Sequence, residues 1–303
     1  MSRIIKWFKL IVWLFTHRRV ILFDHELFKG ISWTYFAQVV MTAADYKRIS
    51  CDLQIISENL FPYRLRENYK HIRVGSKNDG GYVLVDDLNY PVISIGIGFN
   101  SEFDHAMCER KVKVYQFDHT INLEAKSCSN TEFHKIGLTH SRNHNCSNLL
   151  TLDEITRKCN ITENSSAILK VDIEGEEWKV FSDPNVVETL TKFRQIVFEG
   201  HNIQNIINEK FRLEIIQALT NLNKDFAVVN YHSNNNLPGI QILGLFLPQT
   251  FELTMARRDL YVSGIREFQL PRENAANNPQ RYECVDHLNS LYNFTQFQKG
   301  SNL

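Results

Sequence analysis

The stretch from Val92 to Thr120 limits what this chain can fold into more than any other feature of its sequence. In VISIGIGFNSEFDHAMCERKVKVYQFDHT, an apolar strand ends at Gly96 and Gly98, a helix-compatible segment follows, and a second apolar strand ends at Asp118. A glycine has no Cβ, so such a turn can bring backbone amides close to a ligand. A carboxylate at the end of the neighbouring strand can accept both hydroxyls of a ribose. Two glycines alone would fit a plain turn, but the whole succession predicts half of a nucleotide-binding site.

The composition is that of a globular protein. Of the 303 residues, 43% are hydrophobic and 22% are charged, which suffices for one large α/β domain or a domain with an extension. Lysine plus arginine equals aspartate plus glutamate at 34 each, so no overall charge attracts a polyanion. We therefore expect no nucleic-acid partner, although a local basic patch stays open.

Apolar runs predict alternating strands and helices up to about residue 222 and strands alone after it. The expected strands are 82–85, 133–138, 167–173, 193–198, 226–230, 240–246 and 251–254, and the expected helices are 151–159 and 203–222. This order predicts a Rossmann-like α/β sheet, mostly parallel, that ends in an antiparallel hairpin. The pattern offers no second mononucleotide-binding half, which argues against a nicotinamide-dependent oxidoreductase. Residues 79–81 predict the turn of a hairpin before the core, for which a purely structural role is favoured.

The two ends of the chain differ from its centre. The apolar run Leu10–Phe15 is too short to cross a bilayer, which takes about 20 apolar residues. For residues 1–22, a helix packed on the domain, a helix lying in a membrane interface and a signal anchor all stay open. Apolar spacing between residues 31 and 40 predicts an amphipathic helix, so residues 1–70 are interpreted as a helical extension. Residues 263–303 are interpreted as a polar tail.

Neither the cysteines nor the glycosylation patterns decide the compartment. The six cysteines show no CxxC pair and no zinc-ligand spacing. Disulfides, most readily among Cys128, Cys146 and Cys159, and fully reduced thiols are both open alternatives. Acceptor patterns for N-glycosylation occur at Asn145, Asn160, Asn164 and Asn293, in a chain that is rich in asparagine. A membrane-associated or secretory protein and a cytoplasmic one are both compatible with the sequence.

Three motifs carry a resemblance to a known family. The turn SIGIGFN, the acid in YQFDHT and the strand end LKVDIEGEEW resemble class I S-adenosylmethionine-dependent methyltransferases, more narrowly the FkbM-like and methyltransferase-like 24 type. The segments RVGSKNDGGYVLVDD and LPQTFELTMARRDLY resemble flanking blocks of the second group, so the resemblance spans roughly Arg73 to Leu260. It implies a methyltransferase domain over residues 71–262 and S-adenosylmethionine as the cofactor.

The resemblance also implies roles for individual residues. Its cofactor-binding set is Gly96, Gly98, Asn100, Asp118, Asp172 and Glu174. Within it, the two glycines form the loop that approaches the methionine part of the cofactor. Asp118 holds the ribose, and Asp172 and Glu174 belong to an Asp-x-Glu-Gly block beside the transferable methyl group. The chain departs from the family at Ser94, where an acid is common, and at Asn100, where a third glycine is common.

Methyl transfer to a hydroxyl needs alignment and a group that takes up the hydroxyl proton. Asp172 lies at the end of one predicted strand, and Glu199 and His201 lie at the end of the next, so adjacent parallel strands would bring these three candidate catalytic residues together. Histidine has the unperturbed pKa best suited to proton abstraction near neutrality. With Glu174, the same groups could hold Mg²⁺ or Mn²⁺, although a metal is not favoured. Glu176 and Glu177 begin a predicted helix, where stabilisation of the helix dipole is the favoured role.

The sequence thus predicts an O-methyltransferase that acts on a small-molecule or carbohydrate hydroxyl. A catalytically silent binding or scaffold protein with the same fold is the alternative, because the departures at Ser94 and Asn100 weaken the cofactor motif. Neither the identity of the acceptor nor the oligomeric state follows from the sequence.

Overall fold

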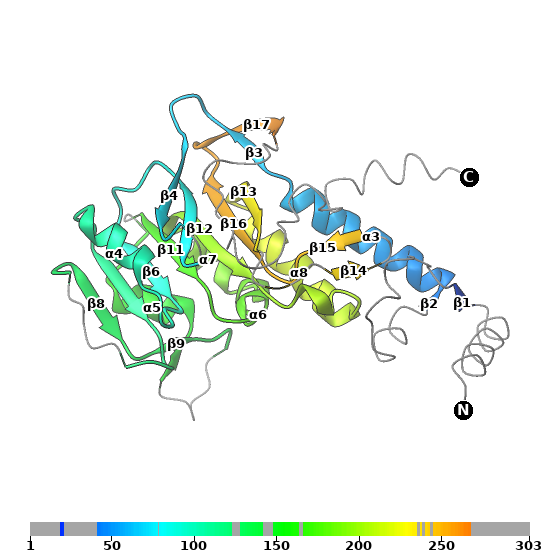
Figure 1. The fold of residues 1–303 in the computed structure, drawn as a ribbon, viewed down its shortest axis with the longest axis horizontal. Helices are drawn as coiled ribbons and strands as arrows, with labels where there is room; N and C mark the ends of the chain where they lie inside the picture. The colour runs from blue at the N-terminus through cyan, green and yellow to red at the C-terminus, as the bar shows by residue number, and fades with distance from the viewer. Residues whose placement is uncertain are drawn as a thin grey trace.

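The computed structural model describes residues 19–20, 41–77, 79–122, 128–141, 148–163, 166–234, 237, 240–242 and 245–267 (Figure 1). A seven-stranded sheet forms the centre, in the order β13-β16-β12-β11-β6-β7-β8. Its strands are β6 (Val92–Ile95), β7 (Val114–Phe117), β8 (Thr131–His134), β11 (Ala167–Val171), β12 (Phe193–Gly200), β13 (Phe226–Ser233) and β16 (Phe251–Arg257). The strands from β12 to β8 run parallel, whereas β16 lies antiparallel to both β12 and β13. The prediction of a mostly parallel α/β sheet is confirmed, but the antiparallel strands at its end, β13 and β16, are not joined as the predicted hairpin, because β14 (Ile240–Ile242) and β15 (Leu245–Leu247) lie between them in the chain.

The strand order reverses at the centre of the sheet. From β6 the chain proceeds outward through β7 to β8 and then crosses back to β11, which pairs with the other side of β6. All five residues of β11, AILKV, are buried, as a parallel strand covered on both faces requires. In open α/β sheets, ligands bind beyond the carboxyl ends of the strands at such a reversal. The topology therefore predicts a ligand site beyond Ile95 and Val171, the last residues of β6 and β11.

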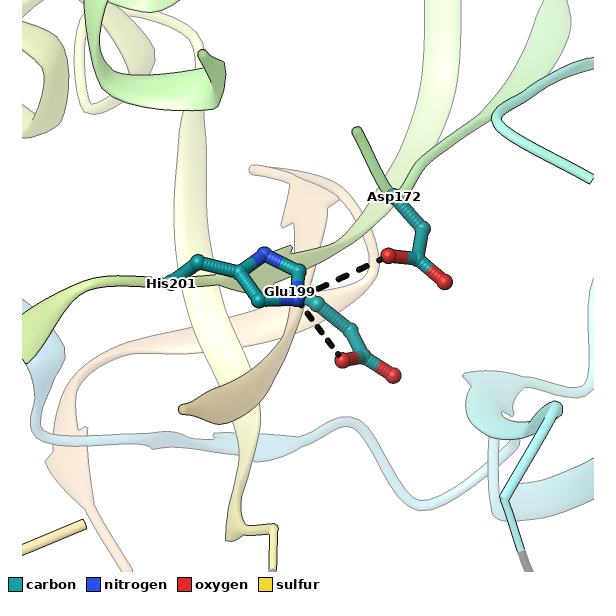
Figure 2. A group of neighbouring side chains, drawn as sticks. All are labelled: Asp172, Glu199 and His201. Carbon is teal, nitrogen blue, oxygen red and sulfur yellow. Dashed lines mark ion pairs between the residues drawn. The ribbon is translucent and has the colours of Figure 1, made fainter. Parts of the chain in front are cut away.

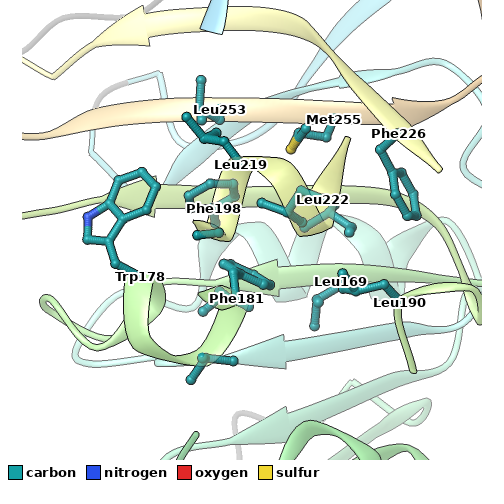
Figure 3. Packing of buried hydrophobic residues seen from close by; sticks show 14 of the residues in the cluster. Leu169, Trp178, Phe181, Leu190, Phe198, Leu219, Leu222, Phe226, Leu253 and Met255 are labelled. Atoms are coloured by element: carbon teal, nitrogen blue, oxygen red, sulfur yellow. The ribbon is translucent and has the colours of Figure 1, made fainter. Parts of the chain in front are cut away.

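Two hydrophobic clusters cover the two faces of this sheet. On one face, α6 (Glu177–Ser182) and α8 (Glu209–Leu222) pack against β11, β12 and β16 through aromatic and leucine side chains (Figure 3). On the other face, α4 (Glu102–Glu109) and the hairpin of β4 (His71–Gly75) and β5 (Gly81–Val85) form the second cluster. Along β11, Leu169 belongs to the first cluster and Ile168 to the second, as the alternation of side chains along a strand requires.

A long helix, α3 (Ala43–Leu60), precedes the hairpin and lies beside α8 (Figure 1). Its buried residues Ile49, Leu53 and Ile56 recur at helical spacing, a pattern that the sequence interpretation overlooked. Arg212 of α8, which is fully buried, donates to Asp52 of α3 at 2.9 Å. The helix expected between residues 31 and 40 lies outside the described residues. So does almost all of the segment 1–22, and no helix in the described part is long and apolar enough to cross a membrane.

The remaining helices and strands are short. They are β1 (Arg19–Val20), β2 (Met41–Thr42), β3 (Tyr63–Leu65), β9 (Gly137–Leu138), β10 (Leu149–Leu150), α5 (Leu152–Lys158), α7 (Val186–Leu190), the 3₁₀ helix η2 (Ile203–Asn205), β14 (Ile240–Ile242), β15 (Leu245–Leu247) and β17 (Tyr261–Arg266). A capping box of Thr151 and Glu154 begins α5, the helix predicted over residues 151–159. The expected helix 203–222 is interrupted, since Asn208 caps α8 by accepting from the Phe211 amide.

Three expectations about strands are corrected. The single strand expected over 240–246 is a separate two-stranded pairing of β14 with β15, outside the main sheet. The strand expected over 133–138 divides into β8 and β9, and β9 pairs with β10. Strand β17 pairs with β3, so regular structure continues past the expected boundary at residue 262 as far as Arg266.

The structure contains one disulfide within its described part, between Cys108 of α4 and Cys128. The expectation of pairing among Cys128, Cys146 and Cys159 is therefore wrong for Cys128, which pairs with Cys108, and for Cys159, which is a buried free thiol. Cys146 lies outside the described residues. Burial raises the pKa of the Cys159 thiol to about 12, so this group stays protonated and unreactive at neutral pH.

Candidate functional site

A cavity of about 550 Å³ opens beyond the carboxyl ends of β6, β7 and β11. Its lining includes the whole set that the resemblance implies for the cofactor: Gly96, Gly98, Asn100, Asp118, Asp172 and Glu174. Phe99, which is fully exposed, lies at its margin, and Ile95, Phe103 and Phe117 supply apolar walls. The volume falls in the range of about 300–1,000 Å³ typical of small-molecule sites. The six residues, which are spread over 79 positions from 96 to 174, thus meet at one cavity.

The bend after β6 needs glycine at position 96. Gly96 has a φ of +77°, and a Cβ on it would lie 1.6 Å from the carbonyl oxygen of Asp172. Gly98 has a φ of +56°, but nothing lies within 4 Å of the position where its Cβ would be. Gly96 therefore lets the bend pack against the end of β11. Gly98 leaves open space beside the cavity.

We expect Gly96→Ala to be more destabilising than Gly98→Ala. Both variants place alanine in the left-handed region, which costs about 1–2 kcal/mol. Only Gly96→Ala also forces a Cβ into the Asp172 backbone, and such overpacking adds about 1–3 kcal/mol. Urea unfolding of the two variants measures the difference. Equal free energies of unfolding would contradict the close packing of the bend on β11.

Asp118 lies directly against this bend. Its Oδ2 accepts hydrogen bonds from the backbone amides of Ile97 and Gly98, both at 2.9 Å. Its Oδ1 accepts from the Thr120 amide at 2.8 Å and from the Thr120 hydroxyl at 2.7 Å. Burial alone would raise the pKa of Asp118, but these hydrogen bonds outweigh it and lower the pKa below the ordinary value. The carboxylate is therefore charged near neutrality, and a ribose hydroxyl on Oδ1 would replace a bond from Thr120.

Asn100 joins the cavity to the β4–β5 hairpin. Its side-chain nitrogen donates to the carbonyl of Asp79 at 2.8 Å, and its side-chain oxygen accepts from the Glu102 amide at 3.1 Å. A Cβ on Gly80 would lie 2.2 Å from the same side-chain nitrogen. The residue that departs from the family pattern thus fastens the hairpin turn to the first turn of α4.

Asp172, Glu199 and His201 converge beside the cavity, as the sequence predicted (Figure 2). Nε2 of His201 lies 3.8 Å from Asp172 Oδ1, 3.5 Å from Glu199 Oε2 and 3.6 Å from Glu174 Oε2. Glu199 is 5% exposed, and its pKa is raised, first by burial and then by the carboxylates of Asp172 and Glu252. Parallel pairing of β11 with β12 causes the convergence, because both strands end at the same edge.

Glu177 orients the imidazole of His201, a role that the sequence interpretation missed. Its carboxylate is fully buried, and Oε1 lies 2.7 Å from His201 Nδ1. The same oxygen accepts from the backbone amides of Ile173 and Gly175, both at 3.2 Å. Burial alone would lower the pKa of His201, but the bond to Glu177 and the carboxylates of Asp172 and Glu174 raise it. Stabilisation of the helix dipole, the role expected for both acids, fits Glu176, which is exposed and pairs with Lys179. It does not account for Glu177.

Tyr82 and Lys170 complete the site, and neither was predicted. Tyr82, on the hairpin expected to be purely structural, donates its hydroxyl to Asp172 Oδ2 at 2.9 Å. Burial, and then the carboxylates of Asp172 and Glu199, raise the pKa of Tyr82, so its hydroxyl remains a donor. Nζ of Lys170 donates to the carbonyl of Gly96 and lies 3.5 Å from Asp172 Oδ2. The hairpin therefore contacts the site, and Lys170 ties the glycine bend to β11.

A larger cavity of about 750 Å³ lies elsewhere, between α5, α7 and the segment after β9. Asp153, Arg157 and Lys192 are among its lining residues, and it includes none of the predicted site residues. Because the predicted cofactor-binding residues line the smaller cavity, we assign the functional site to it.

Comparisons with known proteins do not identify a family. No protein-family model matches the chain, and no curated protein matches it. A solved structure from Streptococcus thermophilus, described as a candidate hemolysin, is similar to it with a TM-score of 0.32 and 14% sequence identity. That likeness covers 74% of this chain and 82% of the other. A similarity this low bears on neither fold nor function.

Proposed function

We propose that this chain is an S-adenosylmethionine-dependent O-methyltransferase that acts on a small-molecule or carbohydrate hydroxyl. The contact of Asp118 with the Gly96–Gly98 bend, at the point where the strand order reverses, carries the proposal. An acid beside a glycine bend at this edge is the arrangement that binds the ribose of a nucleoside cofactor. Gly98 leaves room for such a cofactor, and apolar walls from Ile95, Phe103 and Phe117 suit its base.

The sheet supports the proposal against a dinucleotide enzyme. A dinucleotide-binding sheet has two parallel mononucleotide halves in the order 3-2-1-4-5-6. Here the antiparallel β16 lies between β12 and β13, so the second half cannot repeat the first. A mostly parallel Rossmann-like sheet with one reversed strand, preceded by a helical extension that includes α3, agrees with the resemblance to class I methyltransferases.

The residues beside the cavity suit methyl transfer to a hydroxyl. Bound S-adenosylmethionine supplies a methyl group that is already activated, so the protein must align the acceptor and take up its proton. Asp172 lines the cavity and lies within 4 Å of His201. The proton-accepting cluster of Asp172, Glu199 and His201 therefore lies at the edge of the cavity. The acceptor oxygen forms the new bond to carbon, the carbon–sulfur bond breaks with its electrons on sulfur, and the proton passes to the cluster.

A disulfide and an exposed glycosylation pattern favour a carbohydrate acceptor. The disulfide of Cys108 with Cys128 is typical of an oxidising compartment such as the secretory lumen. Asn160, one of the four glycosylation acceptors, is exposed at the end of α5. Glycan hydroxyls are available to an enzyme in that compartment.

A catalytically silent binding protein is the second candidate. Both oxygens of Asp118 already accept bonds from the chain itself, so its carboxylate is needed for the bend even without a ligand. This protein would bind a nucleoside or nothing, and it would not transfer a labelled methyl group.

Calorimetry with S-adenosylhomocysteine and transfer of labelled methyl from S-adenosylmethionine test the proposal on the full-length protein. We expect binding with one site per chain, and incorporation of label into a panel of glycans or hydroxylated metabolites. Binding without incorporation into any acceptor would favour the silent protein. Absence of binding to both cofactor forms would overturn the methyltransferase assignment.

A further inference from the structure

We propose that Asp172, Glu199 and His201 bind a divalent cation of the Mg²⁺ or Mn²⁺ type. The sequence alone did not favour a metal here. The structure changes that balance through the spacing of the three side chains, the orientation of the imidazole and the local excess of negative charge. The consequence for catalysis, that the cation holds the acceptor hydroxyl, rests on the proposed methyl transfer.

The spacing suits a cation. One ligand atom from each of the three residues lies within 4.8 Å of the other two, and Nε2 of His201 lies 3.5 and 3.8 Å from the carboxylate oxygens (Figure 2). Ligands held about 2.1 Å from a cation in octahedral geometry lie about 3 Å apart when adjacent and about 4 Å apart when opposite. The two separations from Nε2 are longer than ordinary hydrogen bonds, and they fall between the adjacent and the opposite separations of shared coordination.

The imidazole is oriented as metal ligands are. A ligating histidine usually has its other ring nitrogen hydrogen-bonded to a carboxylate, which fixes the ring. Here Glu177 occupies Nδ1 at 2.7 Å and is itself fixed by the amides of Ile173 and Gly175. The indole of Trp178 donates to the His201 carbonyl at 3.0 Å, which holds the backbone too. Nε2 consequently faces the carboxylates of Asp172 and Glu199.

The site has an excess of negative charge that a cation would offset. The carboxylates of Asp172, Glu174 and Glu199 all lie within 4 Å of one imidazole nitrogen. Lys170 reaches Asp172 from the opposite oxygen, Oδ2, while Oδ1 faces His201. Because Glu199 is nearly fully buried, its charged form is costly unless a positive charge lies beside it. A cation between Asp172 Oδ1, Glu199 Oε2 and Nε2 would offset this repulsion.

The ligand types indicate which cation. Two carboxylates and one imidazole, with no thiolate, suit Mg²⁺ or Mn²⁺, and the imidazole makes Mn²⁺ the better probe. Three protein ligands leave coordination positions for water or for an acceptor hydroxyl. A cation-bound hydroxyl loses its proton more readily. The proton would pass to Glu174, whose side chain is 87% exposed and can exchange it with solvent.

Binding of Mn²⁺ to the chelator-treated full-length protein, followed by electron paramagnetic resonance and calorimetry, tests the site. We expect one Mn²⁺ per chain, with affinity at least 10-fold lower in His201→Gln and in Glu199→Gln. The exposed pair His105 and Glu109, 3.3 Å apart on α4, provides matched controls. His105→Gln and Glu109→Gln should leave the affinity unchanged. A Glu177→Gln variant, which loosens the ring without removing a ligand, should weaken Mn²⁺ binding about 10- to 100-fold.

The outcomes separate this proposal from the methyltransferase assignment. Absence of Mn²⁺ and Mg²⁺ binding in a protein that binds S-adenosylhomocysteine would overturn the cation site and leave the proposed function. Cation binding in a protein that does not bind the cofactor would overturn the proposed function and leave the cation site. Binding that persists in His201→Gln and Glu199→Gln would place the cation elsewhere and refute the site. If those variants do not fold, the comparison of wild type with Glu177→Gln and the α4 controls decides.

Discussion

Asp118→Ala should lower the affinity for S-adenosylhomocysteine by at least 100-fold. A hydrogen bond to a charged acceptor contributes about 1.5–3 kcal/mol. Loss of two ribose hydroxyl contacts therefore costs roughly 3–6 kcal/mol, which corresponds to about 10²- to 10⁴-fold in the dissociation constant. The variant also removes the acceptor for the Ile97 and Gly98 amides, so the bend loses its position against the cavity.

Calorimetry measures this loss, and Thr120→Val is the matched control. Valine removes the hydroxyl that bonds to Asp118 Oδ1 but leaves the carboxylate and its bonds to the bend. Because a ribose hydroxyl would compete with Thr120 for that oxygen, we expect Thr120→Val to bind the cofactor as well as the wild type or better. Wild-type affinity in Asp118→Ala would defeat the ribose role of Asp118.

The sequence predicted the parts of the site that depend on strand ends. Parallel strands end at one edge of a sheet, so an acid or glycine that follows an apolar run can be placed without coordinates. Gly96, Asp118 and Asp172 were placed in this way, and all three line the cavity. Pairing of β11 with β12 likewise brought Glu199 and His201 to Asp172.

Residues whose roles depend on packing between distant segments were missed. Tyr82 reaches Asp172 because the β4–β5 hairpin packs against α4 and the sheet, and no pattern near Tyr82 contains that information. Glu177 resembles Glu176 in the sequence, but helical geometry turns one side chain inward to His201 and the other toward Lys179. The disulfide partner of Cys128 is Cys108 on α4, which lies outside the group of Cys128, Cys146 and Cys159 that the sequence favoured.

Asp172→Asn should reduce methyl transfer by about 10²- to 10⁴-fold, the usual contribution of proton transfer, to which this carboxylate would contribute as a proton acceptor or as a cation ligand. Asparagine has nearly the same shape and can still accept the Tyr82 hydroxyl bond on its amide oxygen. It lacks the negative charge that faces His201 and Lys170. The acceptor therefore loses activation while the fold is kept, and the thermal midpoint should change little.

Comparing the rate of labelled methyl transfer with cofactor affinity separates the two roles implied for Asp172. If it activates the acceptor, the rate falls while the dissociation constant of S-adenosylhomocysteine stays within about threefold, a difference of only about 0.7 kcal/mol. If it chiefly binds the cofactor, the two fall together. Asp86→Asn, which removes a partly exposed carboxylate paired with Lys70, controls for a general loss of charge. An Asp172→Asn protein that transfers methyl groups at the wild-type rate would exclude this carboxylate from the chemistry.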